Sequence, residues 1–228
     1  MTDEHFAALA QRMLMEIAAE TIYSSARLGR AALHQRVLDA LAQVPRHEFV
    51  PVELQPYAYL NQPLPFGCGK TISQPYIVAV MTELLDVAPT DVVLEVGTGL
   101  GYQSAILSTL ARRVYTIELI DELARRARQR LARLGYANVE VKVGNGYHGW
   151  PEHAPFDKII VTAAPELIPP PLIHQLKAGG KMMIPAGLAD SQQLILVEKD
   201  ADGTVSTRTI LPVRFSQLEG SDELRSAM

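Results

Sequence analysis

The sequence predicts an α/β protein with a mostly parallel sheet, helices at the N-terminus and an antiparallel hairpin near the C-terminus. Three observations predict this class. Short apolar runs alternate with helical patterns between residues 76 and 187, which is typical of parallel sheets covered on both faces. Apolar residues recur at helical spacing over the first 45 positions. Two β-rich runs flank Asp200-Ala201-Asp202-Gly203, which is a hairpin signal.

Composition and charge exclude several classes of protein. The 228 residues carry a formal net charge of −4 without a block of Lys or Arg, so we expect no nucleic-acid partner. No apolar run approaches the roughly 18 residues of a membrane helix, and the acidic start is unlike a signal peptide. The single cysteine, Cys68, excludes an intramolecular disulfide, and the histidines lack ligand spacing, so no metal is expected. We therefore expect a soluble, cytoplasmic monomer that has no membrane partner.

Two helices are expected in the N-terminal part, over residues 4–28 and 30–44, with Gly29 between them and Pro45 as a stop. Residues 46–75 are rich in proline, so few regular elements are expected there. Their aromatic and aliphatic content argues against disorder, and long loops in compact domains are often functional. We therefore expect an ordered, functional loop.

The remaining elements follow from the alternation of patterns. Helices are expected at 76–87, 102–111, 121–135 and 170–180, and parallel strands at 91–97, 113–119, 139–144, 156–162 and 181–187. The final two runs, within residues 192–215, are expected to pair antiparallel.

A loop with three glycines follows the first of these strands, in "LEVGTGLG" (94–101). Such a loop lies at the carboxyl end of the sheet, where open α/β sheets bind ligands. The dinucleotide fingerprint G-x-G-x-x-G fails, because Tyr102 and Ser104 occupy the two positions where its third glycine would stand.

Glu95, two residues before the first glycine, indicates a different ligand. Its carboxylate would repel a pyrophosphate but suits the ammonium and sulfonium of S-adenosylmethionine. The pattern E-x-G-x-G-x-G is that of motif I in Rossmann-like methyltransferases. A tight strand-to-helix turn that binds nothing is the alternative.

Two later strand ends support an adenosine ligand. Glu118 ends the second strand, and its carboxylate can accept bonds from both ribose hydroxyls, although nicotinamide proteins place an acid there too. Asn145, in "GNG" (144–146) after the third strand, offers a donor and an acceptor to the adenine edge. A β-turn is the alternative for this Asn-Gly pair.

Four segments are more specific: "RHEFVP" (46–51), "LPFGCGKTISQPYIVAVMTELL" (64–85), "LEVGTGLGYQSAIL" (94–107) and "FDKIIVTAAP" (156–165). Together they resemble the protein-L-isoaspartate (D-aspartate) O-methyltransferase family, and "TISQP" (71–75) is the most distinctive piece. The resemblance begins near residue 27, so the preceding residues look like an extension. It implies a Rossmann-like S-adenosylmethionine-dependent methyltransferase fold. Residues 1–75 would supply the N-terminal helices and substrate-cleft loop, and residues 76–228 the methyltransferase core.

The resemblance implies a protein repair enzyme. The methyl group would pass from S-adenosylmethionine, leaving S-adenosylhomocysteine, to the free α-carboxylate of L-isoaspartyl residues in damaged proteins and peptides. D-aspartyl residues are a further acceptor left open. The ester would then collapse to a succinimide, which hydrolyses partly to normal aspartate. An ionised carboxylate is already a nucleophile, so catalysis needs alignment rather than a general base. Three alternatives stay open: a methyltransferase with another acceptor, a non-catalytic adenosine-ligand binding protein, and a nicotinamide oxidoreductase.

The resemblance also assigns site residues. Ser73 would act at the reacting carboxylate, although a serine before a helix is otherwise an N-cap. Ile72 beside it and Val213, in "LPVRF", would contact the substrate. Asn145 stands where many relatives have Asp, and we expect binding to survive; Cys68 has no expected catalytic role. The cofactor-binding set is Gln74, Glu95, Gly97, Thr98, Gly99, Gly101, Gln103, Glu118, Leu119, Asn145 and Gly146.

Overall fold

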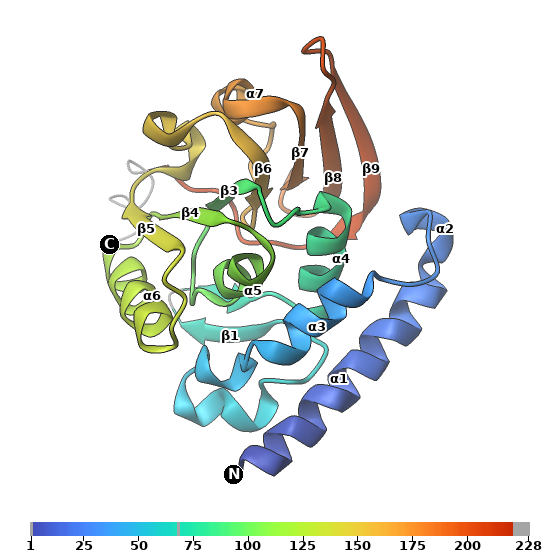
Figure 1. The fold of residues 1–228 in the computed structure, drawn as a ribbon, viewed down its shortest axis with the longest axis vertical. Coiled ribbons are helices and arrows are strands. Elements are labelled where there is room, and N and C mark those ends of the chain that lie inside the picture. The colour runs from blue at the N-terminus through green and yellow to red at the C-terminus, as the bar shows by residue number, and fades with distance from the viewer. Residues whose placement is uncertain (1, 68, 221–228) are drawn as a thin grey trace. The chain divides into compact units, whose positions relative to one another are not determined.

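The computed structural model describes residues 2–67 and 69–220, which form the helices and strands shown in Figure 1. Cys68 lies outside the described residues. The chain divides into two compact units, Met1–Glu83 and Leu84–Met228. The boundary falls inside helix α4 (Pro75–Leu85), and each unit has its own buried apolar residues.

The first unit begins with three helices, α1 (Asp3–Tyr23), α2 (Ser25–Leu28) and α3 (Gln35–Gln43). The buried side of α1 carries the spacing that predicted a helix, and its members are Phe6, Ala10, Met13, Ile17 and Thr21. The predicted first helix breaks at Ser24, and α2 ends at Gly29, which adopts φ +74°. The predicted second helix starts later than expected, at Gln35 instead of residue 30.

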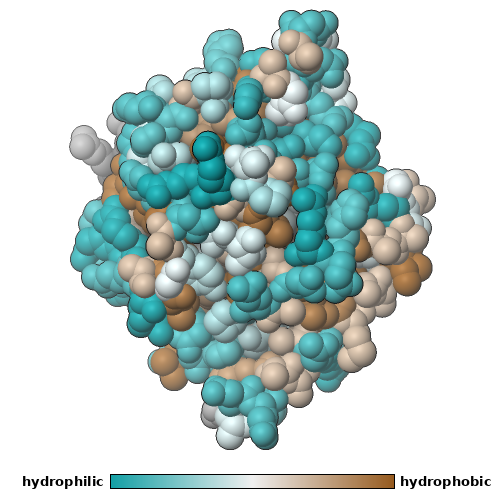
Figure 2. All heavy atoms as spheres, viewed as in Figure 1, coloured by the Kyte–Doolittle hydropathy of each residue, from teal (hydrophilic) through white to brown (hydrophobic). Residues whose placement is uncertain are grey.

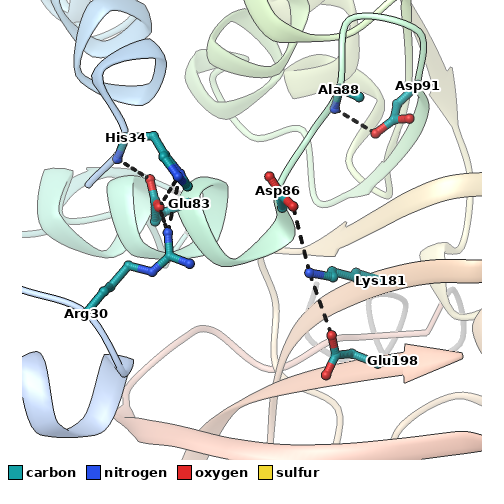
Figure 3. A network of polar contacts seen from close by, with 8 residues as sticks. All are labelled: Arg30, His34, Glu83, Asp86, Ala88, Asp91, Lys181 and Glu198. Carbon is teal, nitrogen blue, oxygen red and sulfur yellow. Dashed lines mark hydrogen bonds and ion pairs between the residues drawn. The ribbon is translucent and has the colours of Figure 1, made fainter. Parts of the chain in front are cut away.

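A buried carboxylate explains the later start of α3. Glu83 on α4 is 1% exposed and accepts the backbone N–H of His34 at 2.8 Å (Figure 3). The guanidinium of Arg30 donates to the same carboxylate, and His34 Nδ1 lies 2.7 Å from it. A buried carboxylate is stable only when it is paired and hydrogen-bonded. The link from residue 30 to 34 therefore serves Glu83 and does not continue a helix.

Residues 46–75 contain more regular structure than predicted. Two 3₁₀ helices, η1 (Arg46–Glu48) and η2 (Val52–Tyr57), precede a hairpin of β1 (Leu64–Gly67) and β2 (Lys70–Ile72). The hairpin is antiparallel and forms a two-stranded sheet of its own. Pro65 is tolerated in β1 because every strand of a two-stranded sheet is an edge strand.

The second unit is built on a seven-stranded sheet in the order β5-β4-β3-β6-β7-β8-β9. The pairs from β5 to β7 are parallel, whereas β8 and β9 are antiparallel additions, which confirms the predicted C-terminal hairpin (Figure 1). The strands are β3 (Val92–Val96), β4 (Arg113–Glu118), β5 (Val139–Val143), β6 (Phe156–Val161), β7 (Leu176–Ala186), β8 (Gln192–Lys199) and β9 (Val205–Val213).

Helices and short turns connect these strands. They are α5 (Tyr102–Leu110), α6 (Asp121–Arg133), η3 (Gly146–His148), η4 (Pro151–His153) and α7 (Pro170–Gln175). The predicted helix at 170–180 is wrong beyond Gln175, because β7 begins at Leu176. Gly179 and Gly180 lie where the pairing of β7 with β6 shifts register, so they mark an irregularity within a strand and not a helix stop.

Strand β3 is central to the second unit, with β4 on one side and β6 on the other. The order of strands along the chain reverses between these two neighbours, so the loop after β3 lies at the topological switch point where α/β sheets bind ligands. Polar contacts such as Lys181 with Asp86 and Glu198 lie at the partly exposed surface of this unit (Figure 3).

Figure 2 shows a mainly hydrophilic face, with apolar residues gathered near α1 and α2. Exposed apolar side chains on α1 include Met15, Ile22 and Tyr23. No helix in the described part of the chain has the length and apolar character needed to cross a membrane. Residues 2–67 and 69–220 likewise contain no cluster of His, Cys, Asp and Glu fit to hold a metal ion.

Candidate active site

The three glycines after β3 are required by the backbone. Gly97, Gly99 and Gly101 have φ values of +97°, +53° and +90°, in a region that other residues rarely adopt. A Cβ at Gly97 would lie 2.5 Å from Thr162 Oγ1, whereas one at Gly99 would meet no atom within 4 Å. Gly99 therefore presents backbone to open space, as a loop that contacts a ligand should.

The glycine loop is fixed from two neighbouring strands. The N–H groups of Gly97 and Thr98 both donate to Ile117 O on β4, at 2.8 and 3.2 Å. After β6, the Thr162 hydroxyl donates to Gly97 O at 2.6 Å and its N–H donates to Val96 O at 2.9 Å. The loop is thus held before any ligand arrives, which limits the ordering cost of binding.

Glu95 lies beneath this loop, in β3, and is fully buried. One carboxylate oxygen accepts the Ser104 hydroxyl from α5, and the other, Oε1, has no hydrogen-bond partner among the described residues. Burial raises the pKa of Glu95 to about 7; hydrogen bonds from Ser104 and Thr116 oppose this rise, and the nearby charge of Glu118 adds to it. A buried oxygen without a donor is costly unless something supplies one. An ammonium group fits that need, so this site suits the amino end of S-adenosylmethionine.

Glu118, the last residue of β4, is also buried. Its Oε2 accepts Gly99 N–H at 2.8 Å and its Oε1 accepts Ile120 N–H at 3.0 Å. Each carboxylate oxygen has a second lone pair, so Glu118 can hold the glycine loop and still accept ribose hydroxyls. The structure thus gives Glu118 a structural contact that its sequence position did not predict.

Asn145 and Gly146 follow β5. Asn145 Oδ1 accepts Tyr147 N–H at 2.9 Å, so the turn expected as the alternative is present. The same arrangement leaves the amide nitrogen to donate to a ring nitrogen of adenine and is compatible with the predicted role. A Cβ at Gly146 would overlap Val96 Cγ1, so only glycine allows η3 to approach β3 this closely.

The strand topology brings the predicted cofactor residues of the second unit together at the carboxyl ends of the parallel strands. Glu95, Glu118 and Asn145 lie at or just beyond the carboxyl ends of the neighbouring strands β3, β4 and β5. Thr98, Gln103 and Gly146 are buried, and Leu119 is half-buried.

Val213 ends β9, and β9 runs in the same direction as β3. Val213 therefore lies on the side of the sheet where the carboxyl ends of the parallel strands lie. Beyond it the chain returns toward the end of β6. Ala164 N–H donates to Ser216 O at 2.8 Å, and Leu218 N–H donates to Ala164 O at 2.9 Å. The segment that follows β9 therefore lies beside the residues that fix the glycine loop.

The other two predicted acceptor residues, Ile72 and Ser73, belong to the first unit, as does the predicted cofactor residue Gln74. Ile72 ends β2 and is buried, and Ser73 and Gln74 are half-buried just before α4. Asn61 Oδ1, not Ser73, accepts Tyr76 N–H in the first turn of α4, at 2.9 Å. This contact weakens the alternative that Ser73 is only the cap of the helix.

Sequence reasoning missed several residues that shape these sites. Arg46 donates to Ser73 O at 2.6 Å, and Thr162 fixes Gly97. Both lie in segments that the family resemblance uses, "RHEFVP" and "FDKIIVTAAP", but no spacing rule connects either residue with its target. Asn61 lies in the proline-rich loop, where no local pattern marks it.

Comparisons with known proteins show which family the chain resembles. Residues 18–223 match the family model described as Protein-L-isoaspartate(D-aspartate) O-methyltransferase (PCMT). The chain is 67% identical over 222 residues to Protein-L-isoaspartate O-methyltransferase 1 of Polaromonas sp. (strain JS666 / ATCC BAA-500), covering 97% of this chain and 94% of that one. It is 58% identical over 219 residues to Protein-L-isoaspartate O-methyltransferase 1 of Cupriavidus necator, covering 96% and 85%.

Solved structures confirm the fold. A protein-L-isoaspartate O-methyltransferase superposes with a TM-score of 0.75 at 26% identity, covering 92% of this chain and 70% of that one. A Plasmodium falciparum structure described as a putative protein-L-isoaspartate O-methyltransferase in complex with S-adenosyl-L-homocysteine gives 0.73 at 22% identity, covering 88% and 97%. The predicted Rossmann-like methyltransferase fold is therefore correct. The family model and the relatives show that this chain belongs to the protein-L-isoaspartate(D-aspartate) O-methyltransferase family.

Proposed function

We propose that this chain methylates the free α-carboxylate of L-isoaspartyl residues in damaged proteins and peptides, with Ser73 as the residue that orients the acceptor. Family membership carries the activity: the chain is an S-adenosylmethionine-dependent protein carboxyl O-methyltransferase that acts in protein repair. We assign binding of the methyl donor chiefly to residues 76–228 and binding of the methyl acceptor chiefly to residues 1–75.

The proposed site for the methyl donor consists of Glu95, the glycine loop and Glu118. S-adenosylmethionine supplies, when bound, an electrophilic methyl group on a sulfonium. The unpartnered Oε1 of Glu95 would accept from its ammonium, Glu118 from its ribose hydroxyls, and Asn145 would donate to its adenine. The remaining cofactor residues, Gln74, Thr98, Gln103, Leu119 and Gly146, would line the same molecule.

The acceptor site rests on Ser73 and its neighbours. An α-carboxylate is ionised at neutral pH and is a nucleophile without a general base. What the protein must supply is orientation of one carboxylate oxygen, and a neutral hydroxyl suits this task because a stronger, charged donor would reduce the nucleophilicity of the oxygen. Because Asn61 already accepts the first N–H of α4, the Ser73 hydroxyl is not required as a cap. Ile72 and Val213 would contact the peptide around the damaged residue.

The activity is tested with an isoaspartyl peptide and its normal aspartyl twin, each incubated with methyl-labelled S-adenosylmethionine. We expect label in the isoaspartyl peptide alone. Equal labelling of the two peptides, or none, would contradict the proposal. A D-aspartyl peptide in a third reaction tests the further acceptor.

The role of Ser73 is tested with Ser73→Ala. Loss of the orienting hydroxyl should lower kcat/KM for the isoaspartyl peptide by about 10- to 100-fold, while the Kd for S-adenosylhomocysteine stays within about twofold. Ser206→Ala, on the exposed part of β9, is the matched control and should change neither. A larger effect on cofactor binding than on peptide methylation would refute the assigned role.

We further propose that the enzyme acts as a monomer in the cytoplasm, with protein and peptide substrates and no nucleic-acid partner. The interspersed charges and the single cysteine support this assignment. Light scattering during gel filtration, at the concentrations used for the assay, tests the monomer directly.

A further inference from the structure

Two side chains from distant parts of the first unit hold the backbone on both sides of Ser73, and a third supports one of them. Arg46 Nη2 donates to Ser73 O at 2.6 Å. Asn61 Oδ1 accepts Tyr76 N–H at 2.9 Å. Glu20 Oε2 accepts from Asn61 Nδ2 at 2.7 Å and lies 3.4 Å from Gln74 Nε2. The short segment that carries Ser73 is therefore fixed by residues far from it in sequence.

Arg46 is fully buried although it carries a charge. Its Nε donates to Ala58 O at 2.7 Å, so one planar guanidinium bonds two carbonyls from separate parts of the loop. The carbonyl of Ser73 belongs to the peptide that leads into Gln74. Fixing this peptide plane fixes the Cα–C axis of Ser73, and the pairing of Ile72 with Leu64 holds the chain on the other side. Together these contacts restrict ψ of Ser73 and so the direction in which its side chain leaves the backbone.

Asn61 fixes the other end of the segment. Pro75 has no N–H, so Tyr76 carries the first N–H of α4, and Asn61 accepts it. The carboxylate of Glu20 accepts a hydrogen bond from the amide nitrogen of Asn61, and this bond orients the amide oxygen of Asn61 toward Tyr76. Burial raises the pKa of Glu20, while its bonds from Asn61 and Gln74 favour the carboxylate.

We propose that Arg46 and Asn61 are positioning residues for the methyl transfer, acting through the Ser73 backbone. A reacting group must be held within about 0.5 Å of its productive position, and here the holding contacts reach Ser73 O and Tyr76 N. Lysine cannot replace Arg46, because a single ammonium cannot bond both carbonyls with the geometry of the planar fork. This inference rests on the function proposed for Ser73 and adds two residues to it.

The test compares Arg46→Lys, Arg46→Met and Asn61→Ala with the wild-type chain. We expect kcat for an isoaspartyl peptide to fall about tenfold in Arg46→Lys and Asn61→Ala and about 100-fold in Arg46→Met. The Kd for S-adenosylhomocysteine, measured by calorimetry, should stay within about twofold in all three. The preserved binding also shows that the second unit of each variant is folded.

Met13→Ala is the control for destabilisation alone. Met13 is fully buried on α1 in the same unit, and no polar contact joins its side chain to the Ser73 segment. This variant should unfold at a lower temperature and keep the wild-type kcat well below that temperature. Arg46→Lys should lose kcat under the same conditions.

A double-mutant cycle with Ser73→Ala separates positioning from a general structural role. If Arg46 acts through Ser73, Arg46→Lys should lower kcat by no more than about twofold in the Ser73→Ala background. The same tenfold loss in both backgrounds, or an equal loss in Met13→Ala, would overturn the inference. A wild-type chain that fails to methylate isoaspartyl peptides would refute the proposed function itself, which is a separate result.

Discussion

Glu95→Gln is expected to remove a pH dependence from the stability of the second unit. Glu95 is fully buried in β3, and burial raises its pKa from the ordinary 4.5 to about 7. Gln has nearly the same shape and cannot ionise. The comparison of the two proteins therefore isolates the titration of one carboxyl group.

The direction of the pH dependence follows from which state of the chain, folded or unfolded, binds the proton of Glu95. Between about pH 4.5 and pH 7 the folded chain keeps a proton on Glu95 that the unfolded chain has lost, so the free energy of unfolding falls as pH rises. The full stabilisation is present below the unfolded pKa and is lost once the pH exceeds the folded pKa. A pKa difference of this size is worth about 3 kcal/mol in total, most of which disappears between pH 5 and pH 8.

Trp150 provides the assay. It is the single tryptophan of the chain, is buried, and packs in the same apolar cluster as Leu94 and Val96, the neighbours of Glu95 in β3. Urea unfolding followed by its fluorescence reports on the second unit. Groups that do not interact with Glu95 titrate equally in both proteins, so their contributions cancel in the difference between the two pH profiles.

The refuting result is simple to state. The wild-type chain should lose about 2–3 kcal/mol more than Glu95→Gln between pH 5 and pH 8. Profiles that stay parallel within about 0.5 kcal/mol would mean that Glu95 ionises normally in the folded chain and that its burial does not hold the proton.

Two other substitutions test the packing of the sites. Gly146→Ala places a Cβ on Val96, so we expect S-adenosylhomocysteine affinity, measured by calorimetry, to fall at least about tenfold, and Val96→Ala should restore part of it; unchanged affinity would contradict this packing. Glu83→Ala leaves His34 N–H and the Arg30 guanidinium without their carboxylate, so urea unfolding followed by circular dichroism should show a loss of about 2–4 kcal/mol, whereas a loss below 1 kcal/mol would contradict the buried pairing.

Periodicity predicted the core elements well, because their patterns are local. The run "DVVLEVG" gave a strand at 91–97, and the structure has one at Val92–Val96, where every residue except the first is buried. The same reasoning failed at residues 176–180. A glycine pair after an apolar stretch is typical of a helix end, but it also fits an irregular strand, and only the pairing of Leu176 with Phe156 distinguishes the two.

The β1–β2 hairpin was missed for a related reason. Pro65 and its neighbouring prolines argue against a strand when the chain is read one residue at a time. In the structure Leu64 pairs with Ile72 and Pro65 with Thr71, so the hairpin leads directly into Ser73. The β1–β2 hairpin, which precedes the predicted catalytic residue, was therefore missed because of the proline content of this loop.

The residues of the candidate site also differ in whether the local sequence reveals them. Gly97, Gly99 and Gly101 were recognisable because their backbone angles demand glycine. Arg46 and Asn61 were not, because their importance lies in what they bond, and their partners stand 27 and 15 positions away. A spacing rule describes neighbours on one element, whereas these contacts join segments that only the folded loop brings together.

Glu95 shows how such an environment changes the meaning of a motif. The sequence presents it as a strand-end charge that selects a cationic ligand, but burial holds its pKa near neutrality, so part of the population is uncharged before a ligand binds. A cation placed at Oε1, which has no partner among the described residues, would favour the ionised form of Glu95, whereas the negative charge of a phosphate would disfavour it. In the proposed site, selectivity for a positive ligand would then arise because the ligand itself favours the ionised form of Glu95 that attracts it. An ionised surface carboxylate would attract cations at all times and would discriminate less between them.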